Sequence, residues 1–262
     1  MSVITLLTDF GHRDAFVGTM KGVILGICPK ARIVDLSHGI AAQRIEEGAF
    51  ILRTAYSYFP DGTVHVAVVD PGVGGERRAL IVETPRYRFV GPDNGVFAHV
   101  YAMEPDLRVV SVTETGFMLP GISNTFHGRD VFAPVAAHLA LGTPVTAFGP
   151  EIDDFHGGSI TGPMVREGGI VGHVLHIDHY GNIITDIDDS LFLETTREKR
   201  FRITLSNLTL DRVSASYDEA AEGAVLAILD SAGLLEIAVN GGNAAQILGV
   251  TPGDRVEVDV AQ

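Results

Sequence analysis

Residues 64–83 read VHVAVVDPGVGGERRALIVE, and this stretch decides the architecture of the first half of the chain. Its first part, Val64–Val69, is a continuous apolar run rich in β-branched valine, which is typical of a strand buried on both faces. A glycine-rich polar loop from Asp70 to Arg78 follows, and a second apolar run, Ala79–Glu83, begins directly after it. Strands buried on both faces belong to sheets that are covered by helices, so the stretch predicts an α/β domain.

Strand and helix signals alternate on both sides of this stretch, over the first 142 residues. Val3–Thr8 and Arg32–Leu36 are predicted strands, whereas Asp14–Ile27 and Gln43–Phe59 have the apolar spacing of helices. Further predicted elements are the strands Tyr87–Val90 and Leu107–Val112 and the helices Asp93–Tyr101 and Val131–Leu141. Repeated β-α-β steps predict, for residues 1–150, a mainly parallel sheet flanked by helices.

The pattern changes after residue 150. Residues 151–169 are rich in glycine, proline and acidic residues, and we expect them to link two domains. Beyond them, strand signals recur with turn residues between them, which predicts a smaller all-β domain, a barrel or a sandwich, over residues 170–262. The predicted strands are Val171–Ile177, Arg202–Leu205, Ala224–Ile228, Leu234–Val239 and Arg255–Val260.

The composition excludes several classes of protein. Apolar residues make up 46% of the 262 residues and charged residues 20%, as in ordinary globular proteins, and no apolar run is long enough to span a membrane. The formal net charge of −14 disfavours nucleic-acid binding. The single cysteine, Cys28, excludes an internal disulfide and a multi-cysteine metal site. Because the N-terminus has the pattern of a first strand and not of a signal peptide, we expect a cytoplasmic protein.

Polar side chains follow the first three predicted strands. Thr8-Asp9-Phe10-Gly11 and Ser37-His38-Gly39 follow the first two, and Asp70 opens the loop after the third. In α/β sheets, ligands bind beyond the carboxyl ends of the strands. Asp9 therefore either accepts hydrogen bonds from a ribose diol or caps the turn that follows it. Asp70 and Arg77 lie on one loop and could hold a water molecule or hydroxide between them if the loop folds back.

His127, in the segment FHGRD, comes just before the last helix of the first domain. The helix dipole disfavours positive charge at a helix N-terminus, so this imidazole is expected to be neutral. A neutral imidazole can accept a proton or orient a water molecule. The alternative is a capping or surface histidine without a chemical role.

His173, His176 and His179 have a spacing that invites a metal-site interpretation. On a strand, alternate side chains point to opposite faces, so His173 and His179 share a face that His176 does not. The spacing therefore disfavours a zinc site. Asp178 and Asn182, which bracket a predicted turn, are better candidates for contact with a ligand.

Six segments together resemble one known family. They are TLLTDFGHRDAFVGTMKGVI (5–24), VVDPGVGGERR (68–78), FVGPDNGVF (89–97), TFHGRDVFAP (125–134), IDHYGNIITDI (177–187) and LLEIAVNGGNAA (234–245). In this order they are similar to the S-adenosyl-L-methionine (SAM) hydroxide adenosyltransferases, the adenosine-forming SAM hydrolases, which are relatives of fluorinase and chlorinase. The resemblance implies an N-terminal α/β domain, a C-terminal β-barrel and a homotrimer. It also implies active sites between the N-terminal domain of one subunit and the C-terminal domain of its neighbour.

The resemblance further implies a reaction in which hydroxide attacks ribose C5′ of SAM and releases adenosine and methionine, with no metal or other cofactor. The family's catalytic Asp, Arg and His fall on Asp70, Arg77 and His127. In the halogenating relatives the Asp and His positions carry other residues, so the presence of all three implies water as the nucleophile. The implied substrate contacts are Asp9 to the ribose hydroxyls, Asp14 and Asp178 to the methionine ammonium, Asn182 and Asn240 to adenine, and Ser231 to the methionine carboxylate.

Three positions depart from the pattern of the family. Gln43 and Leu234 stand where aromatic residues are usual, and Asp230 stands where asparagine is usual. Tyr217 either stacks on adenine in place of the missing aromatics or packs in the core. The departures keep a second function open, that of an adenosine- or SAM-binding protein with vestigial activity. A SAM-dependent halogenase is a third.

Overall fold

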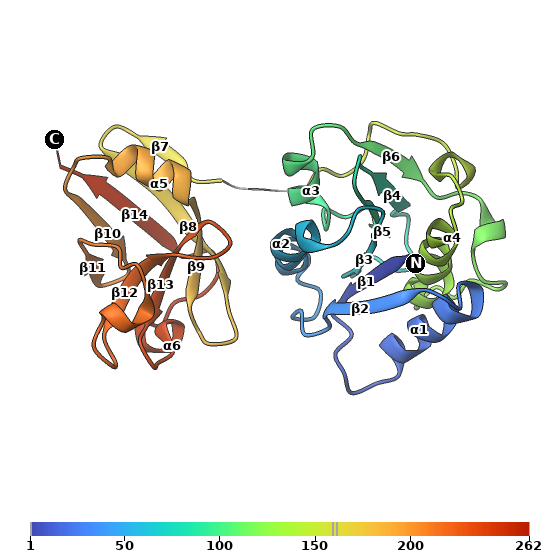
Figure 1. The fold of residues 1–262 in the computed structure, drawn as a ribbon, viewed down its shortest axis with the longest axis horizontal. Coiled ribbons are helices and arrows are strands. Elements are labelled where there is room, and N and C mark those ends of the chain that lie inside the picture. Colours follow the sequence, from blue (N-terminus) through green and yellow to red (C-terminus); the bar gives the residue numbers. More distant parts are fainter. Residues whose placement is uncertain (1, 159, 161, 262) are drawn as a thin grey trace. The chain divides into compact units, whose positions relative to one another are not determined.

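A computed structural model describes residues 2–158, 160 and 162–261 of the chain. The chain forms two compact units, Met1–Ile160 and Thr161–Gln262 (Figure 1). The first unit is an α/β unit and the second is built mainly from antiparallel strands.

The first unit contains a six-stranded sheet in the order β2-β1-β3-β5-β4-β6. Its strands are β1 (Val3–Thr8), β2 (Arg32–Ser37), β3 (Val64–Val68), β4 (Ala79–Glu83), β5 (Arg88–Pro92) and β6 (Arg108–Ser111). Its α-helices are α1 (Phe16–Ile27), α2 (Ile45–Ala55), α3 (Ala98–Met103) and α4 (Ala133–Ala140). Helices α1 and α4 cover one face of the sheet, and α2 and α3 cover the other (Figure 1). Every residue of β3 is buried, as its apolar run predicts.

The sheet is mixed: it is mainly parallel, as predicted, but β4 runs against both of its neighbours. The pairs β1–β2, β1–β3 and β3–β5 are parallel, whereas β4 is antiparallel to both β5 and β6. A tight turn explains the exception, because the N–H of Thr84 donates to the carbonyl of Tyr87 at 2.9 Å between β4 and β5. Neighbouring strands joined by so short a connection must run antiparallel.

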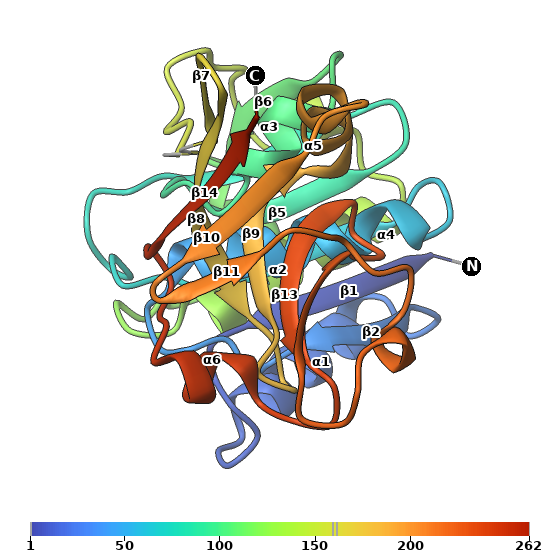
Figure 2. The same cartoon turned by 90° about the vertical axis from the view of Figure 1, so that its left-hand side faces the viewer.

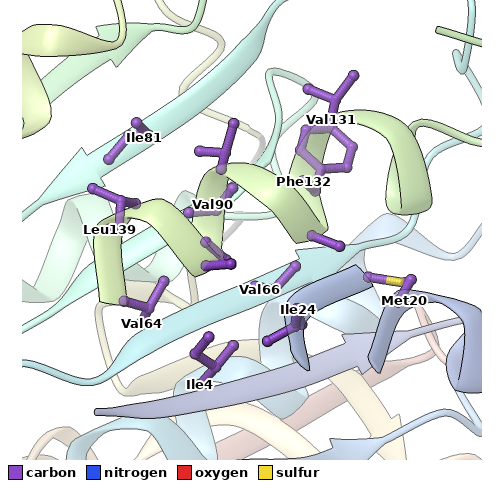
Figure 3. Close-up of a cluster of buried hydrophobic side chains, with 14 of the residues drawn as sticks. Ile4, Met20, Ile24, Val64, Val66, Ile81, Val90, Val131, Phe132 and Leu139 are labelled. Carbon is purple, nitrogen blue, oxygen red and sulfur yellow. The ribbon is translucent and has the colours of Figure 1, made fainter. Parts of the chain in front are cut away.

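One face of this sheet packs against α1 and α4 through a closely filled apolar core (Figure 3). Ile4 and Val66 come from the sheet, Met20 from α1, Phe132 from the turn before α4, and Leu139 from α4 itself. Each is at most 5% exposed. Burial of such a side chain stabilises a fold by roughly 1.5–3 kcal/mol, so the strands form a firm base for the loops at their ends.

The connections of β1 place a topological switch point in the sheet, the kind of position where α/β proteins bind ligands. From β1 the chain passes through α1 to β2 on one side, and from β2 it passes through α2 to β3 on the other side of β1. The crossovers therefore diverge at the carboxyl ends of β1 and β3, which is the topological switch point of the sheet. Asp9 follows β1 there, and Asp70 follows β3 by one residue.

All four predicted helices differ in their bounds from the observed ones, and three of the differences have local causes. The segment Gln43–Phe59 forms α2 and then a 3-10 turn, Tyr56–Tyr58. The third helix begins at Ala98, because Asn94 uses its side chain to accept from Val96 N–H and to donate to the Val69 carbonyl. The last helix opens with a π-helical turn, Gly128–Phe132, before α4.

The second unit contains an eight-stranded sheet in the order β11-β10-β14-β8-β9-β13-β12, with β7 paired to β8 (Figure 2). Its strands are β7 (Met164–Arg166), β8 (Gly169–Ile177), β9 (Ile183–Asp188), β10 (Phe201–Leu205), β11 (Leu208–Leu210), β12 (Val225–Leu229), β13 (Leu234–Val239) and β14 (Arg255–Val260). Its helices are α5 (Asp189–Thr196) and α6 (Ala244–Leu248). All of its strand pairs are antiparallel.

This sheet is nearly closed and resembles the predicted barrel. Among the described residues, β11 and β12 form no ladder with each other. A single bridge joins Ser214 to Ile228 of β12, with the Ser214 N–H 2.8 Å from the carbonyl of Ala227. Strands β7, β9 and β11 and both helices are additional to the predicted elements, and β7 lies within the stretch expected as a linker. In the described part of the chain, no helix has the length and apolar character needed to cross a membrane.

Candidate active site

Asp70, Arg77 and His127 form one hydrogen-bonded cluster in the first unit. The Nε atom of Arg77 lies 3.0 Å from each carboxylate oxygen of Asp70, and its Nη2 also pairs with Asp70 Oδ2. The same Nη2 lies 2.7 Å from Nδ1 of His127. The Asp70 and Arg77 side chains are 4% and 11% exposed, so bulk water screens their charges little.

The glycine-rich loop makes this convergence possible by folding back after β3. Within it, the N–H of Val73 donates to the Asp70 carbonyl and the N–H of Gly75 to the Gly72 carbonyl. Gly74 has φ +76°, a conformation that favours glycine, and a Cβ there would overlap the carbonyl oxygen of Asn124. The loop therefore packs directly on the backbone just before His127.

Interactions around the π-helical turn hold the segment that carries His127. Asp130 is 1% exposed, and its carboxylate accepts from the backbone N–H of Ser123 at 2.8 Å and from the guanidinium of Arg129. On the same turn, the Phe132 ring lies 5.3 Å from the guanidinium carbon of Arg77. Arg77 and the segment that carries His127 thus both contact one π-helical turn, and such turns are frequent at functional sites.

The hydrogen bond to Arg77 determines which nitrogen of His127 carries the proton. A guanidinium offers only donors, so Nδ1 must accept and the ring is the neutral tautomer protonated at Nε2. Burial, and then the positive charge of Arg77, lower the pKa of His127 below its ordinary value. In this arrangement Nε2–H is free to orient a water molecule as a donor, whereas acceptance of a proton at Nδ1 requires the bond to Arg77 to break.

Asp9 follows β1, which is the neighbour of β3 in the sheet, and Asp70 follows β3. Its carboxylate accepts from the backbone N–H of Gln43 at 2.8 Å, and Gln43 has φ +67°. Thr8 is hydrogen-bonded to Nδ1 of the buried His38, and this anchors the turn that carries Asp9. Asp14 is exposed in the bend before α1. Gln43, one of the departures from the family pattern, thus contributes its backbone to this site.

In the second unit, Asp178 and Asn182 contact each other across a tight turn. Asp178 Oδ1 accepts from the backbone N–H groups of Tyr180 and Asn182, and Asp178 Oδ2 lies 3.2 Å from the side-chain nitrogen of Asn182. Asn182 is 7% exposed. The Asp178 carboxylate therefore shapes the turn as well as presenting a negative charge.

Ser231 and Asn240 lie beyond opposite ends of β13. Ser231 is exposed in the turn before the strand. The side-chain amide of Asn240 donates to the carbonyl of Ala220 at 2.8 Å. Asp230 Oδ1 accepts from the N–H groups of Ala232 and Leu234, a role that the amide oxygen of asparagine can also fill, and Leu234 is 1% exposed.

The three histidines considered for a metal site are held apart by the local structure. His173 and His176 lie on β8, whose register with β9 shifts between Val174 and His176. His179 lies beyond the end of that strand, in an exposed turn, so the argument from strand alternation does not apply to it. Within the residues that the structure describes, no group of three or more His, Cys, Asp or Glu side chains is placed to hold a metal ion.

Glu236 is a buried acid that the sequence analysis missed. It lies in the middle of β13 and is 3% exposed. A glutamate inside an otherwise apolar strand, LLEIAV, was the available signal, because glutamate is almost never fully buried unless it is paired.

The chain is similar to known proteins over nearly its whole length. The family model of the SAM hydroxide adenosyltransferase N-terminal domain matches residues 4–149, and the model of the C-terminal domain of the same family matches residues 172–257. The chain is 39% identical to the (R)-S-adenosyl-L-methionine hydrolase of Salinispora tropica, over 97% of both chains. It is 28% identical to a fluorinase of Nocardia brasiliensis, over 98% of this chain and 97% of the fluorinase.

The fold is also similar to that of solved structures. An uncharacterized conserved protein from Thermotoga maritima has a TM-score of 0.92 and 35% identity, and the alignment covers 98% of this chain and 99% of that protein. Both domain models match here in the family's order, and full-length relatives share more than a third of their residues with this chain. The chain therefore belongs to the SAM hydroxide adenosyltransferase family.

Proposed function

We propose that this protein hydrolyses S-adenosyl-L-methionine to adenosine and L-methionine through attack of water or hydroxide on ribose C5′. The observation that carries the proposal is the Asp70–Arg77–His127 cluster beyond the carboxyl end of β3. The names of the full-length relatives, which are SAM hydrolases at 37–39% identity, support the same reaction. The positive sulfonium of SAM makes methionine a good leaving group, so we expect no metal or other cofactor.

Each member of the cluster has a distinct role in this proposal. His127 Nε2–H donates to the oxygen of the attacking water, and the Arg77 guanidinium stabilises the negative charge that develops there. Asp70 accepts the proton that the water loses. As the new O–C5′ bond forms, the C5′–S bond breaks and its electron pair stays on sulfur, which leaves as a neutral thioether. Alignment of the water opposite that bond is the main task of the protein.

The substrate contacts proposed here follow the chemistry of SAM. Asp9 binds the ribose hydroxyls, and Asp14 and Asp178 face the ammonium group. The remaining contacts are Asn182 and Asn240 with adenine and Ser231 with the methionine carboxylate. The hydrogen bond from Gln43 to Asp9 supports the first assignment, because a carboxylate held by one backbone donor keeps further lone pairs for a diol.

Incubation of the protein with SAM in ¹⁸O-labelled water tests this function directly. We expect adenosine labelled at the 5′ oxygen, together with unlabelled methionine, as measured by mass spectrometry. Consumption of SAM that requires chloride or fluoride, with a 5′-halogenated product, would instead identify a halogenase. Saturable binding of adenosine or SAM by calorimetry without any turnover would identify a binding protein.

We also propose a homotrimer in which each site takes Asp70, Arg77 and His127 from one subunit and Asp178 and Asn182 from its neighbour. Two inactive variants, Asp70→Asn and Asn182→Ala, should then restore activity when they are co-expressed. In randomly mixed trimers about a quarter of the sites would be intact in both halves. Light scattering gives the mass, and the separately expressed variants are the controls. If every site lay within one subunit, each would carry one of the substitutions, and no activity would return.

A further inference from the structure

Glu236 occupies a face of β13 that the main core of the second unit does not use. Leu235, Ile237 and Val239 point into that core, and because side chains alternate along a strand, Glu236 points to the opposite face. It is nevertheless 3% exposed. A carboxyl group in such a place loses its hydration, so a specific partner must compensate for that loss.

The strand register places Glu236 next to β9, the strand that begins directly after the turn formed by Asp178 and Asn182. Glu236 lies opposite Ile228 of β12 and opposite Ile184 of β9. Asn182 comes directly before Ile183, the first residue of β9, in the turn that leads into the strand paired with Glu236. Hydrogen bonds join Asn182 to Asp178, so the Asp178 turn lies at the start of β9.

Tyr217 is the partner of Glu236. Its hydroxyl donates to Glu236 Oε1 at 2.8 Å, while the residue is 43% exposed. It lies in the short 3-10 turn Tyr217–Glu219, so its own backbone segment gives it little support. Burial is the main reason that the pKa of Glu236 is raised to about 6. The hydrogen bond from Tyr217 lowers this pKa, whereas the nearby carboxylates of Asp230 and Asp178 raise it. The same burial raises the pKa of the Tyr217 hydroxyl, so that it remains a donor.

We propose that Glu236 is a positioning residue that holds the Tyr217 ring, through this hydrogen bond, in the orientation that packs against the adenine of the substrate. Two features of the structure support the role. One end of an exposed ring is tied to a buried acid, and the ring shares its neighbourhood with Asp178. That the occupant is adenine rests on the proposed function. A ring held before binding loses less freedom on binding, so Glu236 contributes to nucleoside affinity and not to the chemical step.

A double-mutant cycle on adenosine binding tests the proposal. Glu236→Leu and Tyr217→Phe should each raise the calorimetric Kd for adenosine by roughly fivefold to tenfold. This change corresponds to the free-energy cost of ordering one side chain on binding. The double variant should be no weaker than either single variant, because both remove the same bond. Glu236→Gln keeps an acceptor for the hydroxyl and should recover most of the affinity. The kcat at saturating SAM should stay within about twofold of the wild-type value throughout.

Glu194→Gln, on the exposed side of α5, is the matched control and should change neither quantity. Additive losses in the double variant would overturn the proposal, as would an unchanged adenosine Kd in Tyr217→Phe, which keeps the ring and removes only the hydroxyl. If the wild-type protein hydrolyses SAM but the variants give either of these two contradicting results, only the role of Glu236 fails. If the wild-type protein neither binds adenosine nor consumes SAM, the proposed function fails, and the role of Glu236 fails with it.

Discussion

The Asp70→Asn variant is expected to release adenosine from SAM about 10²–10⁴ times more slowly than the wild-type protein, the range typical of losing a general base. Asparagine has nearly the same size and can still accept from Arg77, but it cannot take a proton from water. The Asp70 side chain is 4% exposed, so solvent has little access to replace it as the base. Single-turnover formation of adenosine, measured by chromatography at saturating SAM, reports this step.

A surface carboxylate provides the control for this substitution. Asp61 also pairs with an arginine, Arg86, but both side chains are more than half exposed, and an exposed pair of this kind contributes about 0–1 kcal/mol. Asp61→Asn should therefore leave both the rate and the stability nearly unchanged. Asp70→Asn should in addition lower the free energy of unfolding, because it leaves the charge of Arg77 buried without a counter-charge. A rate within tenfold of wild type would contradict the assignment of Asp70 as the base.

The Gly74→Ala variant is expected to lose at least about 2 kcal/mol of unfolding free energy, from backbone strain and from overlap with a neighbouring backbone. Alanine disfavours the φ of +76° found there, and its methyl group would meet the carbonyl oxygen of Asn124, which cannot rotate away as a side chain can. Relief of the overlap would move the loop away from the segment that carries His127. A displacement of about 1 Å at a reacting group can cost a hundredfold in rate, so kcat should fall by about that factor.

The Gly62→Ala variant separates the effect of backbone strain from the effect of overlap with a neighbouring backbone. Gly62 has a similar φ of +82°, but a Cβ there would have no atom within 4 Å, and the residue precedes β3 at the end opposite Asp70. This variant should lose only about 1–2 kcal/mol from strain and keep its full rate. Urea denaturation followed by circular dichroism measures the stability of both variants. Equal rates in the two would show that the contact between Gly74 and Asn124 does not position the cluster.

Local patterns predicted the N-terminal strands well because burial on both faces leaves a mostly apolar run with few polar residues in it. Val64–Val69 and Val3–Thr8 are examples, and the polar residues that end them lie where α/β proteins bind ligands. The direction of β4 was not predictable in this way, because it depends on a four-residue turn and on which neighbour the strand pairs with. Strand β9 was missed because its residues Thr185, Asp186 and Asp188 interrupt the apolar pattern. Thr185 is nevertheless buried, because its hydroxyl donates a hydrogen bond to the Leu235 carbonyl.

The amino-acid sequence by itself determined which groups are available for chemistry: an acid and a guanidinium seven residues apart on a glycine-rich loop, and an imidazole before a helix. Only the tertiary structure decided that His127, 50 residues from Arg77, accepts a hydrogen bond from it, and therefore which ring nitrogen carries the proton. It also decided that Glu236, in β13, is hydrogen-bonded to Tyr217, in the turn before β12. The physical reason is that spacing along a chain governs local backbone geometry, whereas hydrogen bonds between distant segments depend on how the sheets and loops pack.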